Sequence, residues 1–134
     1  MRMSVKNLIA FSFLSGLSGL MLAQPALADG DADKGKKVFA KCMACHTIEE
    51  AKNRVGPHLV NIMDRKTASV EGFKYSPAMT KAGEDGMIWD EATLTAYLTA
   101  PKAFMPGNKM AFAGLKKPED ISNLIAFIHS KAVQ

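Results

Sequence analysis

The feature that most constrains this chain is the segment Cys42-Met43-Ala44-Cys45-His46, in which a histidine directly follows two cysteines spaced three positions apart. These are the only two cysteines among 134 residues. The spacing is typical of c-type haem attachment, in which each thiol adds to one vinyl group of the porphyrin and the next imidazole can ligate the iron. The segment therefore predicts one covalent haem c, held by Cys42 and Cys45, with His46 as an iron ligand.

Other uses of the two cysteines are weaker hypotheses. A thioredoxin-like redox pair needs a βαβ context, and no alternating strand pattern is present. A structural zinc site needs four ligands, and the remaining histidines, His58 and His129, are not spaced as a pair. A simple disulfide stays possible but would leave long irregular segments unordered. We expect His58 to be a solvated loop residue and His129 to be exposed on the last helix.

The first 28 residues have the pattern of a secretory signal peptide. Arg2 and Lys6 precede an apolar stretch over residues 8–23, and Ala26-Leu27-Ala28 matches a cleavage site. An uncleaved anchor is the alternative, but the apolar stretch is shorter than the ~20 residues needed to span a bilayer. The sequence predicts a cleaved segment 1–28, a domain over 29–134, export to the periplasm and no stable membrane insertion after cleavage.

The composition of the chain excludes several classes of protein. The length suits a single domain. A net charge of +4 is too small for strong binding to nucleic acid, and aromatic residues, at 7%, are scarce for base stacking. No nucleic-acid partner is expected.

The domain is predicted to be all-α, with short helices and long loops. Helical spacing and capping residues predict helices over residues 33–41, from Ser76-Pro77 to 81, from Asp90 until Pro101, and from Pro118 into the last residues. Residues 47–74 remain irregular. Structureless segments of this length are unusual in a compact domain, so a large apolar prosthetic group is expected to order them.

A sixth iron ligand has to come from elsewhere in the chain. Met110 is the preferred candidate because it follows a Pro106-Gly107 turn and so lies on a loop that can approach the iron from the far side. A methionine opposite a histidine raises the reduction potential. A methionine is also a common core residue, and the rival candidates are Met63, Met79, Met87 and Met105.

With these motifs in order, residues 29–132 resemble the class I cytochromes c, in particular the mitochondrial-like bacterial members. Further matching features are Gly35 and Phe39 in the first helix, Gly56-Pro57, and the segment Pro106-Gly107-Asn108-Lys109-Met110. The resemblance implies the cytochrome c fold, in which a few short helices and long loops wrap one haem. It also implies a close contact between the first helix and the last, at Leu124 and Phe127.

The resemblance also implies roles for five residues that support the haem. The Pro57 carbonyl would accept the second N–H of His46 and so fix the ring. Arg65, Tyr75 and Trp89 would hold the buried haem propionates, which need hydrogen bonds and charge compensation. Tyr97 would donate a hydrogen bond to the sulfur of Met110. From the residues alone, Tyr97 and Trp89 can equally be core aromatics, and Arg65 can pair with Asp64 or Glu71 at the surface.

Three departures from the family pattern stand out. Asn108 replaces a usual threonine, which implies an altered propionate contact. Met79 replaces an asparagine that joins a buried water network, so one polar partner is removed. Extra residues around Gly83-Glu84-Asp85-Gly86 are expected to form a surface turn.

The leading functional hypothesis is a soluble periplasmic carrier of single electrons, which is expected to be a monomer and not an enzyme. Its partners would be acidic-faced redox proteins: a quinol-oxidising cytochrome complex, a terminal oxidase, a reaction centre or a dehydrogenase. A haem enzyme or sensor with a labile sixth ligand, and a haem-free thiol–disulfide protein, are the alternatives. A basic ring around the haem edge is expected from Lys37, Lys41, Arg54, Lys102, Lys109, Lys116 and Lys117.

Overall fold

The computed structural model describes residues 30–132, and the predicted signal peptide lies outside the described residues. The elements follow the order α1 (Ala32–Phe39), α2 (Pro77–Glu84), α3 (Glu91–Thr99), α4 (Pro101–Phe104) and α5 (Pro118–Ser130). Strand pairing within residues 30–132 is limited to one isolated bridge between Lys66 and Ile88. The all-α prediction is confirmed. None of the described helices has the length and apolar character required to cross a bilayer.

Helices α1, α2 and α3 begin at residues whose side chains cap them, whereas α4 and α5 begin at a proline without such a cap. Asp90 accepts a hydrogen bond of 2.7 Å from the Thr93 amide, and Ser76 accepts one of 3.1 Å from the Met79 amide. These caps satisfy amide groups that the first helical turn leaves unpaired. Two predicted boundaries differ, since α1 ends at Phe39 and α2 continues to Glu84. Pro101 ends α3 as predicted, but it also opens α4, a further short helix.

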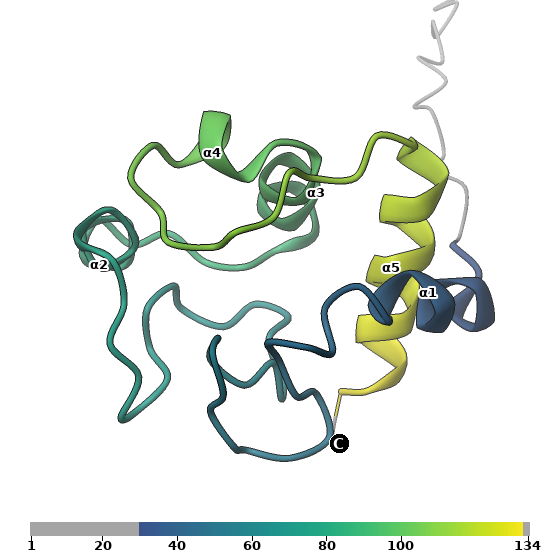
Figure 1. The fold of residues 1–134 in the computed structure, drawn as a ribbon, viewed down its shortest axis with the longest axis horizontal. Helices are drawn as coiled ribbons and strands as arrows, with labels where there is room; N and C mark the ends of the chain where they lie inside the picture. The colour runs from purple at the N-terminus through teal and green to yellow at the C-terminus, as the bar shows by residue number, and fades with distance from the viewer. Residues whose placement is uncertain (1–29, 133–134) are drawn as a thin grey trace, which may run out of the picture.

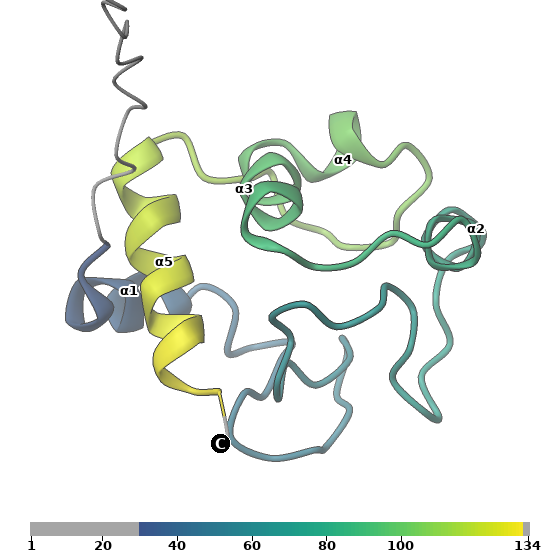
Figure 2. The same ribbon diagram turned by 180° about the vertical axis from the view of Figure 1, so that it is seen from behind.

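The first and last helices cross in close contact (Figures 1 and 2). Gly35 makes this possible, because a Cβ at that position would lie 1.9 Å from the Asn123 carbonyl oxygen and 2.8 Å from the Phe127 Cβ. The rings of Phe39 and Phe127 pack with their centroids 5.2 Å apart. The predicted contact between the ends of the domain is present, with Asn123 as its closest point.

The segment around Gly83 matches the predicted surface turn only in part, since Asp85 and Gly86 form an exposed turn but Gly83 does not. Gly83 is buried within α2, and a Cβ there would lie 2.2 Å from the Thr67 carbonyl oxygen. Only the following Asp85 and Gly86 lie outside the helix, with Gly86 at φ +90°. The glycine is therefore needed for packing against the long loop, a tertiary contact that the local sequence does not display.

Two parts of the chain lie on either side of the molecule's middle (Figure 1). The irregular segment from residue 40 to 76 forms one part. Helices α3 and α4 and the loop over residues 105–117 form the other, and α5 flanks both. The long loop is irregular as predicted, and the burial of Ile48, Ile62 and Val70 anchors it to the rest of the domain.

Candidate functional site

A cavity of about 360 Å³ lies between these two parts of the fold. Its size falls in the ~300–1,000 Å³ range of cofactor pockets. All nine residues predicted for the site line it: Cys42, Cys45, His46, Pro57, Arg65, Tyr75, Trp89, Tyr97 and Met110. The apolar residues Leu59, Leu94, Leu98 and Phe112 line it too. The fold therefore brings the predicted site residues together around one apolar space.

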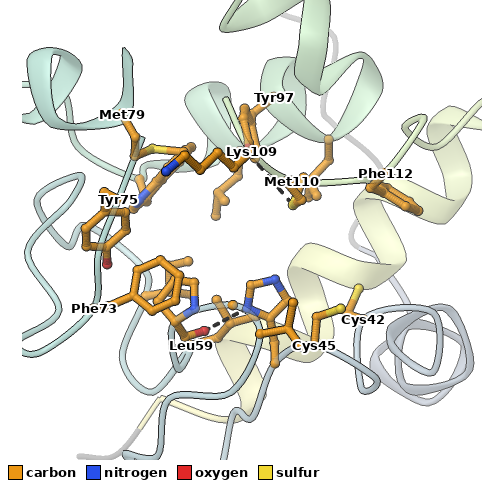
Figure 3. A pocket seen from close by; sticks show the side chains of 18 of the residues that line it. Cys42, Cys45, Leu59, Phe73, Tyr75, Met79, Tyr97, Lys109, Met110 and Phe112 are labelled. Atoms are coloured by element: carbon orange, nitrogen blue, oxygen red, sulfur yellow. Dashed lines mark hydrogen bonds between the residues drawn. The ribbon is translucent and has the colours of Figure 1, made fainter. Parts of the chain in front are cut away.

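Cys42, Cys45 and His46 lie on one wall, in a turn that follows α1 (Figure 3 labels the two cysteines). The amides of Cys45 and His46 both donate to the Cys42 carbonyl oxygen, at 3.1 and 2.9 Å. Both thiols are free and half-buried. Burial raises the pKa of the Cys42 thiol, whereas redox-active thiols have a lowered pKa. The shift at Cys42 is thus opposite to that of a redox-active thiol.

The imidazole of His46 is fixed by the segment Gly56-Pro57. Its Nδ1 atom lies 2.7 Å from the Pro57 carbonyl oxygen, so an N–H at Nδ1 donates there and Nε2 is left as the available ligand atom. Burial lowers the pKa of His46, which the hydrogen bond to Pro57 partly opposes. A neutral imidazole is the form that binds a metal.

Met110 lies on the facing wall, beside Tyr97 and Phe112 (Figure 3). The Tyr97 hydroxyl donates to the Met110 sulfur at 3.8 Å. Burial raises the pKa of Tyr97 to about 12, so this phenol keeps its proton at neutral pH. Of the rival methionines, Met79 also lines the cavity, whereas Met105 is buried in the protein core.

Arg65 enters the cavity wall from the long loop. Its guanidinium donates to the carbonyl oxygens of Val60 at 2.8 Å and His58 at 3.0 Å, while its Nε is buried with no protein partner. The surface ion pairs with Asp64 or Glu71 that the sequence left open are absent among the described ion pairs. A buried, unpartnered cationic N–H on a cavity wall fits an anionic group of a ligand.

Tyr75 and Trp89 line the same cavity. The Tyr75 hydroxyl accepts a hydrogen bond from the Val70 amide at 3.3 Å, and its own proton is available to a ligand. Trp89 is buried and packs on Tyr97, with ring centroids 5.0 Å apart. Trp89 is thus partly used for packing, as the core-aromatic alternative holds for it, and both Tyr75 and Trp89 still reach the cavity.

Two residues call for comment. His58 lies in a loop as expected, but it is only half-exposed, and its Nδ1 is buried with no protein partner. Asn108 does not line the cavity, because its side chain bonds to Pro101, Met105 and Met110 instead. This fits the altered propionate contact that the resemblance implied. His129 is exposed as expected.

Among the residues of the cavity wall that sequence analysis missed are Val55, Phe73 and Lys74. Phe73 packs edge-on against Tyr75, with centroids 4.8 Å apart. A spacing of two in an extended segment puts both rings on one side, and this signal was available. Val55 gives no such signal. Of the basic residues expected around the edge, all are exposed, and Lys41 and Lys109 line the cavity.

The paired cysteines, the oriented histidine and the apolar cavity together define a protein that binds one covalent haem c. A family model for cytochrome c matches residues 32–132. The chain belongs to the cytochrome c family and is a monohaem electron-transfer protein.

Individual relatives of this chain support the same family assignment. The chain is 50% identical over 95 residues to a cytochrome c2 of Afifella marina, covering 70% of this chain and 77% of the relative. It is 49% identical over 100 residues to cytochrome c-550 of Nitrobacter winogradskyi, covering 74% and 89%. Among solved structures, cytochrome cH from Methylobacterium extorquens matches with a TM-score of 0.69 at 39% identity, covering 75% of this chain and 99% of that one.

Proposed function

We propose that this chain is a periplasmic carrier of single electrons in which His46 and Met110 are the two axial ligands of the haem iron. The observation that carries the proposal is the position of both residues on the walls of one apolar cavity, with the thiols of Cys42 and Cys45 beside the histidine. Bound haem supplies reversible one-electron exchange between ferrous and ferric iron. Residues 1–28 would be the cleaved export signal and residues 29–134 the mature domain.

The ligand pair decides what the protein can do. His46 and Met110 would hold the iron from both walls of the cavity and would leave small molecules no open site, which argues against an enzyme or gas sensor. The thioether favours ferrous iron. Tyr97 supports Met110, because its hydroxyl donates a hydrogen bond to the Met110 sulfur at 3.8 Å and so restrains that side chain on the cavity side. Pro57 restrains the imidazole in the same way.

Arg65, Tyr75 and Trp89 are proposed to hold the propionates. The buried, unpartnered Nε of Arg65 supports this role most directly, since a carboxylate that accepts from it would satisfy both groups. Burial lowers the pKa of Arg65 but leaves it cationic at neutral pH. A propionate buried against this charge is stabilised without a free counterion.

The cavity rim is suited to brief docking. Lys41, Lys74 and Lys109 are exposed at the cavity, and Val55 is an exposed apolar residue among them. Positive charge at the rim steers an acidic-faced partner, and a small apolar contact permits fast release. Partners would be membrane redox complexes with acidic faces, such as a quinol-oxidising complex, a terminal oxidase or a reaction centre, or a soluble dehydrogenase. A monomer suffices for this cycle.

The test is spectroscopic. The full chain is expressed in a host that exports it and attaches haem, and the periplasmic fraction is purified. We expect a haem that stays with the chain on a denaturing gel, and a sulfur-to-iron charge-transfer band in the far red of the oxidised spectrum. Met110→Ala should abolish that band. Met79→Leu, on the same cavity wall, should retain it. Persistence of the band in Met110→Ala would refute the ligand assignment.

A further inference from the structure

We propose that Asn108 is a positioning residue for Met110: its side-chain amide fastens the Met110 backbone to the buried end of α4 and so holds the sulfur in place. The inference rests on the proposed function, in which Met110 is an iron ligand. It assigns to Asn108 a role in the loop rather than at the cavity.

The loop begins with a tight reversal of the chain. The Asn108 amide donates to the Met105 carbonyl oxygen at 3.1 Å, with Pro106 and Gly107 between them. Gly107 has φ +85°, and proline followed by a positive-φ glycine is the signature of a type II turn. This turn brings Asn108 back over α4.

The Asn108 side chain then makes three hydrogen bonds. Its Nδ2 donates to the carbonyl oxygens of Pro101 at 2.9 Å and Met105 at 2.8 Å. Its Oδ1 accepts from the Met110 amide at 2.9 Å. Both amide protons and the amide oxygen are therefore engaged. A threonine hydroxyl, with one proton, cannot reproduce the two donated bonds.

The bonds connect Met110 to fixed points. Pro101 is fully buried, and Met105 is 5% exposed in the core. Asn108 itself is absent from the cavity wall, so its influence passes through the Met110 backbone. Tyr97 restrains the Met110 sulfur independently, from α3. Met110 is thus held at two places, its amide and its sulfur, by two different elements.

Competition with imidazole measures this effect. Free imidazole can replace a methionine ligand, and loss of the far-red band reports the replacement in the oxidised holoprotein. We expect Asn108→Ala to bind imidazole about tenfold more tightly than the parent protein, the size expected when hydrogen bonds to the displaced ligand's loop are lost. Asn108→Thr, which can still accept from the Met110 amide, should fall between the two. Asn108→Asp should not restore the parent's weak binding of imidazole, because a carboxylate cannot donate hydrogen bonds to the two carbonyl oxygens.

The variant Ile125→Val separates the proposed effect of Asn108 from a general loss of stability. Ile125 is buried on α5 and does not line the cavity. This variant should lower resistance to denaturant to a similar extent as Asn108→Ala, yet leave imidazole affinity at the parent value. Equal imidazole affinity in Asn108→Ala and the parent, or an equal increase in both variants, would overturn the inference. If instead the parent lacks the far-red band, or Met110→Ala retains it, the ligand assignment itself fails.

Discussion

The Nδ1 atom of His46 lies 2.7 Å from the Pro57 carbonyl oxygen, and the neighbouring Gly56 leaves no room for a side chain beside the ring. A Cβ at Gly56 would lie 2.2 Å from the Cε1 atom of His46. The same two-residue segment therefore orients the imidazole by a hydrogen bond and confines it by contact. Ring orientation is what decides which nitrogen is available to the iron.

Gly56→Ala should displace the His46 ring. The added methyl has to move either the imidazole or the loop, and overpacking of this kind costs about 1–3 kcal/mol of folding free energy. The hydrogen bond to Pro57 should be lost with it. Denaturant unfolding measures the first effect, and the NMR signal of the Nδ1 proton reports the second. Lys52→Ala, an exposed change in the same loop, should leave both as they are.

Gly35→Ala should destabilise the contact between α1 and α5. In an exposed helix this change is favourable by up to ~1 kcal/mol. Here the methyl would meet the Asn123 carbonyl oxygen at 1.9 Å, a backbone atom that cannot rotate away. We expect a loss of about 1–3 kcal/mol in unfolding free energy. A stabilised variant would contradict the described helix crossing. Lys36→Ala, on the exposed side of α1, is the matched control.

The Asp90 cap of α3 should make stability depend on pH. The hydrogen bond from the Thr93 amide lowers the pKa of Asp90 below its usual 3.8. The ionised form is therefore preferred in the folded state. Its contribution is fully present above the unfolded pKa and is lost as the pH falls through the folded pKa.

Asp90→Asn isolates the charge, because the amide oxygen can still accept from Thr93. The parent should be more stable than Asp90→Asn at neutral pH, and the difference should vanish in strong acid. Asp90→Ala removes the acceptor as well and should be the less stable variant at neutral pH. A difference that does not change with pH would show that the carboxylate charge plays no part.

The basic rim should control how fast a partner docks. Lys41→Glu and Lys109→Glu should each slow association with an acidic redox partner several-fold at low salt, because rim charges act mainly on the association rate. Added salt should slow the parent and reduce the difference. Lys81→Glu, on α2 and outside the cavity wall, is the charge-matched control. Stopped-flow kinetics at several ionic strengths provides the measurement. A rate that is independent of ionic strength would refute docking through this rim.

Local chemistry made much of the fold predictable. Ser76, Asp90 and Pro118 lie at helix starts because capping and proline geometry act within a few residues. The positions of Cys42, Cys45 and His46 were predictable because haem attachment requires one fixed spacing, whereas the other cavity residues were expected from the resemblance to the cytochromes c. What failed depends on distant contacts, since Gly83 is buried against Thr67. The hydrogen bonds of the Asn108 side chain could not be read from the sequence, because a residue type alone does not show which way a side chain turns.

The crossing of α1 with α5 joins the two ends of the domain. Closing so long a stretch of chain costs conformational entropy, which this contact has to offset. Phe39 on α1 and Leu124 and Ile128 on α5 also line the cavity. A change that separates the two helices should therefore open the cavity along this side as well as lower the stability of the domain.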